Sequence, residues 1–95
     1  MQDEYFEWDD QKAARNARDH EVTFEAARDV FRDVFSLEWI DHGHGDTEER
    51  FVALGMVEAR LIYVSYTLRG SRIRIISARM AEPYERRKYH NANQT

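Results

Sequence analysis

The last third of the chain concentrates arginine in a strand-like segment, residues 69–79, which reads Arg-Gly-Ser-Arg-Ile-Arg-Ile-Ile-Ser-Ala-Arg. A guanidinium group stays charged at physiological pH and can donate to two oxygens of one phosphate or carboxylate at once. The segment therefore has the chemistry to bind an anionic ligand or partner.

Charge is divided unevenly along the sequence. Residues 1–49 hold 15 acidic and 5 basic side chains, whereas residues 50–95 hold 3 acidic and 9 basic ones. Such asymmetry is typical of a protein with a surface for nucleic acid or for an acidic partner. A second interpretation stays open, in which the arginines form a solvated sheet face that acidic helices balance.

Length and composition predict one soluble domain, residues 1–95. Hydrophobic residues make up 42% of the chain, and no apolar run approaches the ~20 residues of a membrane span. The acidic N-terminus lacks the basic and apolar regions of a signal peptide, so a cytoplasmic protein is expected. Cysteine is absent, which excludes a disulfide framework, a thiolate nucleophile and a cysteine–zinc site.

The N-terminal half predicts two helices. Asp9 or Asp10 can cap a helix over 11–19. Thr23 can cap a second helix over 24–35, in which apolar residues recur at the i, i+3, i+4, i+7 and i+8 spacing of a core-facing stripe. The residues of this stripe are Ala27, Val30, Phe31, Val34 and Phe35.

The C-terminal half predicts a sheet, because its β-branched and aromatic residues favour strands and Gly70 supplies the positive φ of a tight hairpin. The expected strands are 5–8, 36–40, 49–56, 60–67 and 72–78, with a loop at 41–47 and a last helix at 82–89. In the last strand, alternation sets Ile73, Ile75 and Ser77 on one face and Arg72, Arg74 and Ile76 on the other. This order predicts an α+β domain with helices on one face of an antiparallel sheet.

Motifs in a characteristic order extend from residue 5 to residue 89. They are Phe6-Glu7-Trp8-Asp9, Lys12, Asn16, His20, Val22-Thr23-Phe24-Glu25-Ala26, Glu49-Arg50, Gly55, Thr67-Leu68-Arg69-Gly70, the run 73–81, Glu85-Arg86-Arg87 and Tyr89. In their order and spacing, the sequence resembles the BrnT family of toxins from bacterial type II toxin–antitoxin pairs. It departs from the pattern in its net charge of −4, where RelE-like ribonucleases are basic, and in Glu21, where the family has glycine.

The resemblance implies a RelE-like fold, with two N-terminal helices packed on an antiparallel sheet and a short C-terminal helix. It implies an endoribonuclease that cleaves RNA without a metal or other cofactor and halts translation. It also implies a BrnA-like antitoxin with a ribbon-helix-helix part, which forms a hetero-oligomer with the toxin and provides its only link to DNA.

Metal-free RNA cleavage needs a base for the 2′-hydroxyl proton, an acid for the leaving oxygen and cations for the charged phosphorane. Arginine suits the cationic role, imidazole changes charge near neutral pH, and tyrosine rings can stack on splayed bases. The candidate catalytic residues are Lys12, His20, Arg50, Arg74, Arg79 and Glu85, and the candidate RNA-binding residues are Tyr63, Tyr66, Arg69, Arg72 and Tyr89.

Each candidate has a structural alternative. The arginines can pair with the acidic helices, and a histidine at a helix C-terminus is favourable with the helix dipole without any catalysis. Lys12 can be an exposed helical lysine, and a tyrosine in a strand can serve packing alone. The rival interpretation of the whole chain is a non-catalytic protein that binds the antitoxin as a co-repressor, or a toxin that has lost its activity.

Other kinds of site find no support in the sequence. The loop from Asp41 to Asp46 holds a His-x-His pair between aspartates, but nothing nearby fixes a coordination geometry, so no metal is predicted. The chain has no glycine-rich phosphate loop, no H-E-x-x-H and no G-x-S-x-G motif.

Overall fold

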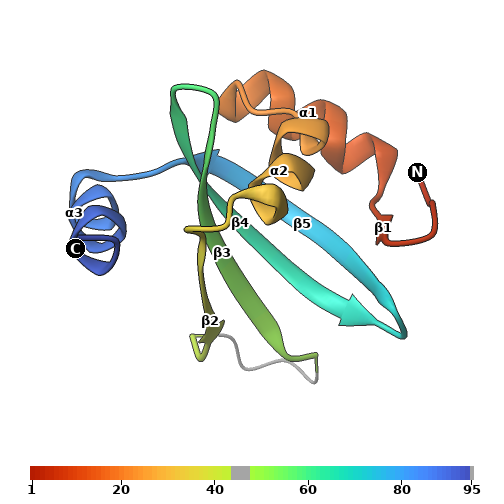
Figure 1. Cartoon of the computed structure of the whole chain (residues 1–95). Helices are drawn as coiled ribbons and strands as arrows, with labels where there is room; N and C mark the ends of the chain where they lie inside the picture. Colours follow the sequence, from red (N-terminus) through yellow and green to blue (C-terminus); the bar gives the residue numbers. More distant parts are fainter. Residues whose placement is uncertain (44–47, 95) are drawn as a thin grey trace.

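The computed structural model describes residues 1–43 and 48–94. Its elements are β1 (Phe6–Glu7), α1 (Asp10–His20), α2 (Phe24–Asp29), the 3₁₀ turn η1 (Val30–Arg32), β2 (Leu37–Asp41), β3 (Arg50–Val57), β4 (Arg60–Arg69), β5 (Arg72–Met80) and α3 (Pro83–Ala92). This is the predicted mixed α+β arrangement, with two helices before the long strands and a short helix after them (Figure 1).

The strands form one five-stranded sheet in the order β1-β5-β4-β3-β2. Strands β2 to β5 are antiparallel to their neighbours as predicted, but β1 runs parallel to β5 and pairs Phe6 with Ile73. The prediction of a wholly antiparallel sheet is therefore wrong at this edge. Because β1 has two residues, the C-terminal half of β5 has no strand on its outer side within the described residues.

Helices α1 and α2 cover one face of the sheet (Figure 1). As predicted, Thr23 caps α2 by accepting a hydrogen bond from the Ala26 amide, and Asp9 caps α1. Helix α2 then buries Phe24 and Ala27 in the main core. The other buried members of this core are Trp8, Val22, Val30, Ala53, Ile62, Val64, Tyr66, Ile75 and Ala78.

Helix α3 packs on the opposite face, where Tyr89 contacts a smaller cluster formed with Leu54 and Leu61. The neighbouring residue Ala53 belongs to the main core, and successive residues of a strand point to opposite faces. The expectation of helices on one face is therefore right for α1 and α2 and wrong for α3.

Asp33 explains why the second helix is shorter than predicted. Its side chain accepts hydrogen bonds from the Phe35 amide (2.9 Å), the Met56 amide (2.8 Å) and the Tyr89 hydroxyl (2.6 Å). These bonds favour an extended backbone at Asp33, and α2 gives way to η1 before it. The prediction that Val34 and Phe35 face the core is wrong, since they are 89% and 58% exposed.

Strand β5 contains a bulge near its middle. Tyr66 of β4 pairs with Ile75, and Ser65 pairs with Ser77, so Ile76 is an extra residue in β5. An extra residue shifts the alternation of the strand that contains it.

The bulge changes which side chains share a face. The prediction that Ser77 faces the same way as Ile75 is wrong, because Ala78 joins Ile75 in the main core and Ser77 must point away from it. Arg79 therefore lies on the same face as Arg74, opposite α1 and α2.

Among the described residues, left-handed backbone occurs at Glu21, at Glu58 in the turn between β3 and β4, and at Gly70. Gly70, in the turn between β4 and β5, has a φ of 59°, as predicted for this hairpin. Glu21 ends α1 with a φ of 57° and donates its amide to the carbonyl of Ala17. This helix end thus reaches the conformation that favours glycine without having one.

Gly55 lies where α2 and η1 approach β3. A Cβ at this position would stand 2.9 Å from Val30 Cγ1, 3.1 Å from the Val30 carbonyl oxygen and 3.2 Å from Ser36 Cβ. We expect Gly55→Ala to lower the free energy of unfolding by about 1–3 kcal/mol, because an overpacked core must shift. Urea unfolding measures this loss, and a midpoint equal to that of the parent would contradict the close approach.

Within residues 1–43 and 48–94, no helix has the length and apolar character that crossing a membrane requires.

Candidate active site

One face of α1 and the outer side of β5 form the walls of an open groove. A first cavity of about 230 Å³ is lined by Lys12, Arg15, Asn16, Asp19, His20 and Ile76. A second, of about 370 Å³, is lined by Arg18, Asp19, His20, Glu21, Arg79, Met80 and Glu82. The two cavities share Asp19 and His20, and together they are called the α1–β5 groove.

Asn16 fixes α1 against the part of β5 that β1 leaves uncovered. Its Nδ2 donates to the carbonyl oxygens of Val22 and Ala78, both at 2.8 Å, and its Oδ1 accepts from the Ala78 amide at 3.1 Å. The side chain is 7% exposed. The Asn16 side chain therefore makes the two hydrogen bonds to the Ala78 backbone that a neighbouring strand would otherwise make. These bonds set the distance between the two walls of the groove.

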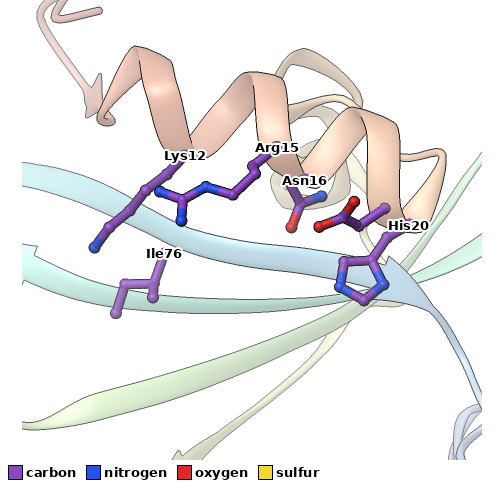
Figure 2. Close-up of a pocket in the computed structure, with 6 residues that line it drawn as sticks. Lys12, Arg15, Asn16, His20 and Ile76 are labelled. Carbon is purple, nitrogen blue, oxygen red and sulfur yellow. The ribbon is translucent and has the colours of Figure 1, made fainter.

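Among the basic side chains of the groove, Arg18 pairs with Asp19 and Arg79 pairs with Glu85, whereas three on α1 form no such pair in the part of the chain that the structure describes. Lys12, Arg15 and His20 are exposed, and within the described residues their side chains form no hydrogen bond or ion pair. Figure 2 shows them reaching from α1 over β5, on either side of Asn16. Their donors are therefore available to an anion in the groove.

Arg79 lines the other end of the groove and is held by Glu85. Its Nη1 and Nη2 donate to the two Glu85 carboxylate oxygens at 2.8 and 3.0 Å, and its Cζ lies 3.9 Å from the centroid of the Tyr63 ring. Glu85 is 1% exposed, and its Oε1 also accepts from the Glu82 amide at 2.8 Å. This geometry suits Glu85 to positioning Arg79 and gives it no open approach to a substrate.

The burial and pairing of Glu85 predict a contribution to stability that acid removes. Burial raises the pKa of its carboxyl, but the hydrogen bonds from Arg79 and the Glu82 amide outweigh burial and lower the pKa from its ordinary value of 4.5. A carboxyl with a lowered folded pKa stabilises the fold above its unfolded pKa, and this contribution is lost as pH falls through the folded value. We expect Glu85→Gln to lower the free energy of unfolding by about 1–3 kcal/mol at pH 7, and by less as the pH approaches 3.

Urea midpoints of the parent and Glu85→Gln between pH 7 and pH 3 measure this difference. Glu4→Gln, at an exposed position, is the matched control and should leave the midpoint unchanged throughout. A gap between parent and Glu85→Gln that stays constant down to pH 3 would show that the Glu85 charge contributes nothing.

The remaining predicted arginines lie outside the groove, and oxygens of this chain bind three of them. Arg74 Nη1 donates to Glu7 Oε2 at 2.7 Å. Arg69 Nε donates to the Glu48 carboxylate at 3.0 Å. Arg72 Nε donates to the backbone carbonyl of Asp3 at 2.7 Å. Arg50 is half-buried on β3, in register with Asp41 of β2. The partners of the three arginines come from the N-terminal strand region and the segment before β3, so the arginines do not pair with the acidic helices.

Two predicted tyrosines serve packing. The ring of Tyr66 stacks on Phe51, and burial, with the Glu38 carboxylate nearby, raises its pKa to about 12. Tyr89 is 6% exposed, and burial together with its hydrogen bond to Asp33 raises its pKa to about 12. Neither ring lies open to a base, and neither hydroxyl can ionise near neutral pH. Tyr63 is half-buried beneath Arg79.

Sequence reasoning overlooked Arg15 and the structural role of Asn16. Five polar residues of α1 recur at i, i+3, i+4, i+7 and i+8, which is the spacing of one helix face. They are Lys12, Arg15, Asn16, Asp19 and His20. The signal was present in the sequence as a polar stripe on one face of the helix predicted over 11–19.

No three histidine, aspartate or glutamate side chains of the described residues lie close enough together to hold a metal ion. The His-x-His loop includes residues 44–47, which lie outside the described ranges. The expectation that this loop binds no metal therefore stays a prediction.

The fold and the groove define a small α+β protein with an open site whose α1 wall carries Lys12 and Arg15, cations that suit a phosphate-bearing ligand. Residues 8–85 match a protein family described as "Ribonuclease toxin, BrnT, of type II toxin-antitoxin system". The chain belongs to this family of ribonuclease toxins, as the order of its motifs indicated. A search of the curated proteins found no match.

Proposed function

We propose that this chain is a metal-independent endoribonuclease whose active site is the α1–β5 groove. The observation that carries the proposal is the contrast among its basic side chains. Lys12, Arg15 and His20 line one groove and their side chains form no hydrogen bond or ion pair in the described part of the chain, whereas Arg74 and Arg79 already bind carboxylates. A phosphate can bind at the first group without displacing a carboxylate.

In this proposal the reaction is a transesterification within RNA. The 2′-hydroxyl loses its proton and attacks the adjacent phosphorus, and the bond to the 5′-oxygen of the next nucleotide breaks as that oxygen is protonated. The products are a 2′,3′-cyclic phosphate and a 5′-hydroxyl. His20 carries one of the two protons and water in the open groove carries the other. Lys12 and Arg15 stabilise the negative charge on the phosphorane, so side chains supply the cations that the step needs.

Arg79 contributes a fixed positive charge at the far end of the groove, since Glu85 holds its guanidinium in one orientation. Arg50, Arg69, Arg72 and Arg74 are proposed only as contacts to RNA outside the cleaved phosphate. Tyr66 and Tyr89 have packing roles and are not proposed to touch RNA.

The finer features of the family resemblance belong to the same proposal. In this proposal the fold is RelE-like, and cleavage of messenger RNA stops translation. A BrnA-like antitoxin with a ribbon-helix-helix part neutralises the toxin by covering the groove, and it links the resulting hetero-oligomer to DNA.

Induced expression without an antitoxin tests this function. The parent should arrest growth and fragment cellular RNA, whereas an equally abundant Lys12→Gln/Arg15→Gln variant should do neither. This pair is preferred to Arg79→Ala, which would leave the buried Glu85 carboxylate without its partner. If the parent accumulates in folded form without harming growth, the non-catalytic co-repressor or inactive toxin is the better account.

A further inference from the structure

We infer that the sheet face opposite α1 and α2 carries a base-stacking subsite for single-stranded RNA, centred on Trp39. This inference rests on the proposed function, because it concerns how the same RNA is held beyond the α1–β5 groove. No feature of the sequence had marked Trp39 as a binding residue.

Four side chains from four elements form a row in which two adjacent aromatic rings lie between two cations. Lys88 Nζ of α3 lies 3.9 Å from the ring centroid of Trp39 on β2, and Arg79 Cζ of β5 lies 3.9 Å from that of Tyr63 on β4. The two rings meet edge to face with their centroids 6.2 Å apart. These residues, Lys88, Trp39, Tyr63 and Arg79, are called the cation–aromatic row.

Packing holds the two rings of the cation–aromatic row in place, but neither ring is fully buried. Trp39 and Tyr63 pack at one side against the cluster of Leu54 and Leu61, and both remain partly accessible. A ring already held in place loses little conformational freedom when a base stacks on it. This separates Trp39 and Tyr63 from Tyr66, whose ring is enclosed in the main core.

Lys88 covers the indole with a group that can move. It is exposed, and in the described part of the chain its ammonium has no carboxylate partner. When a base takes its place over Trp39, the ammonium can turn to the phosphate of the same nucleotide, so the positive charge is kept. Stacking of this kind contributes about 1–3 kcal/mol per base and tolerates any sequence.

The surroundings of the row favour a polyanion with planar groups. Arg86 and Arg87 of α3 are exposed and form no ion pair among the described residues, and Tyr84, on the same helix, is 56% exposed. Basic side chains interleaved with aromatic rings are typical of surfaces that bind single-stranded nucleic acid.

Arg79 connects the row to the groove. It lines the groove's second cavity and also covers Tyr63, so it belongs to both surfaces. An RNA strand whose phosphate lies beside His20 can pass Arg79 at the end of β5 and, further along the strand, place a base on Trp39.

The fluorescence of Trp39 reports occupancy directly. The chain has two tryptophans, and Trp8 is 4% exposed, so a Trp8→Phe variant leaves Trp39 as the only tryptophan, which excitation at a wavelength that tyrosine does not absorb selects. The probe is a mixed-sequence 2′-O-methyl RNA dodecamer, which lacks the attacking hydroxyl and is not cleaved. We expect saturable quenching of Trp39, and affinity about 5- to 100-fold weaker for Trp39→Leu in the parent background.

Two variants serve as controls for the affinity measurement. Tyr5→Leu removes an aromatic ring that is 64% exposed and lies outside the row, and it should leave affinity unchanged. Trp39→Phe keeps a stacking ring and should restore most of the affinity that Trp39→Leu loses. If Trp39→Leu fails to fold, the quenching of Trp39 fluorescence by RNA in the Trp8→Phe variant is the measurement that decides whether a base stacks on Trp39.

Cleavage by the parent separates the failure of this inference from the failure of the proposed function. Cleavage without quenching of Trp39 would overturn the subsite and leave the function standing. Absence of both cleavage and binding would overturn both proposals. Quenching of equal strength by polyglutamate would show an acidic-protein surface and would also overturn base stacking.

Discussion

Replacing Asn16 with aspartate is expected to lower the free energy of unfolding by about 3–5 kcal/mol at neutral pH. The amide Nδ2 donates to the Val22 and Ala78 carbonyl oxygens. A carboxylate at the same place would set a buried negative charge against two acceptors and leave both without a donor. Asn16→Ala should be destabilising by about 2–3 kcal/mol, because it removes these two bonds and the one accepted from the Ala78 amide, but adds no buried charge.

Urea unfolding followed by circular dichroism measures both losses. At a denaturant slope of about 1.5 kcal/mol/M, the aspartate variant should unfold at a concentration about 2–3 M below the parent. Arg15→Gln is the matched control, since Arg15 precedes Asn16 on the same helix, is exposed and should change stability by less than about 0.5 kcal/mol. An unchanged midpoint for Asn16→Asp would mean that Asn16 does not join α1 to β5.

Replacing Lys12 and Arg15, two cations of the groove that form no ion pair within residues 1–43 and 48–94, is expected to reduce cleavage by purified protein strongly while leaving the fold intact. Loss of one preorganised donor to a transition-state oxyanion costs about 10²–10³ in rate in enclosed sites. The α1–β5 groove is open to solvent, which weakens each charge. For Lys12→Gln/Arg15→Gln we therefore expect kcat/KM to fall by about 10²-fold.

A second double variant controls for net charge. Arg86→Gln/Arg87→Gln also removes two exposed cations, but from α3, which does not line the groove. It should weaken RNA binding mildly and leave the rate at saturating RNA unchanged. Equal losses from the two double variants would show that overall charge governs cleavage and would reject the groove as the active site.

The sequence predicted most of the fold because its local signals agree with its packing. Thr23 and Asp9 cap the helices that they precede, and Gly70 adopts the positive φ that the hairpin requires. The second helix was predicted too long because the apolar spacing continued through Val34 and Phe35. Three hydrogen bonds to Asp33 end the helix before these residues. Two of the three are donated by Met56 of β3 and Tyr89 of α3, which are distant in sequence.

The candidate site was predicted less well, because it depends on how elements meet. A bulge at Ile76 cannot be read from the pattern of β5 alone, yet it decides that Arg79 shares a face with Tyr63. The sequence also identifies arginines but not their carboxylate partners, such as Glu7 for Arg74. Arg15 was within reach of sequence reasoning, as a member of a polar stripe on α1.

The most direct test of the central claim is cleavage of a defined single-stranded RNA by purified parent and His20→Asn in excess EDTA, with the product ends identified by mass spectrometry. The account predicts that the parent produces 2′,3′-cyclic phosphate and 5′-hydroxyl ends despite the chelator. His20→Asn should be slower by about 10²-fold or more, as expected for loss of a proton carrier. Cleavage that EDTA abolishes, or a His20→Asn variant as fast as the parent, would contradict a metal-independent active site in the α1–β5 groove.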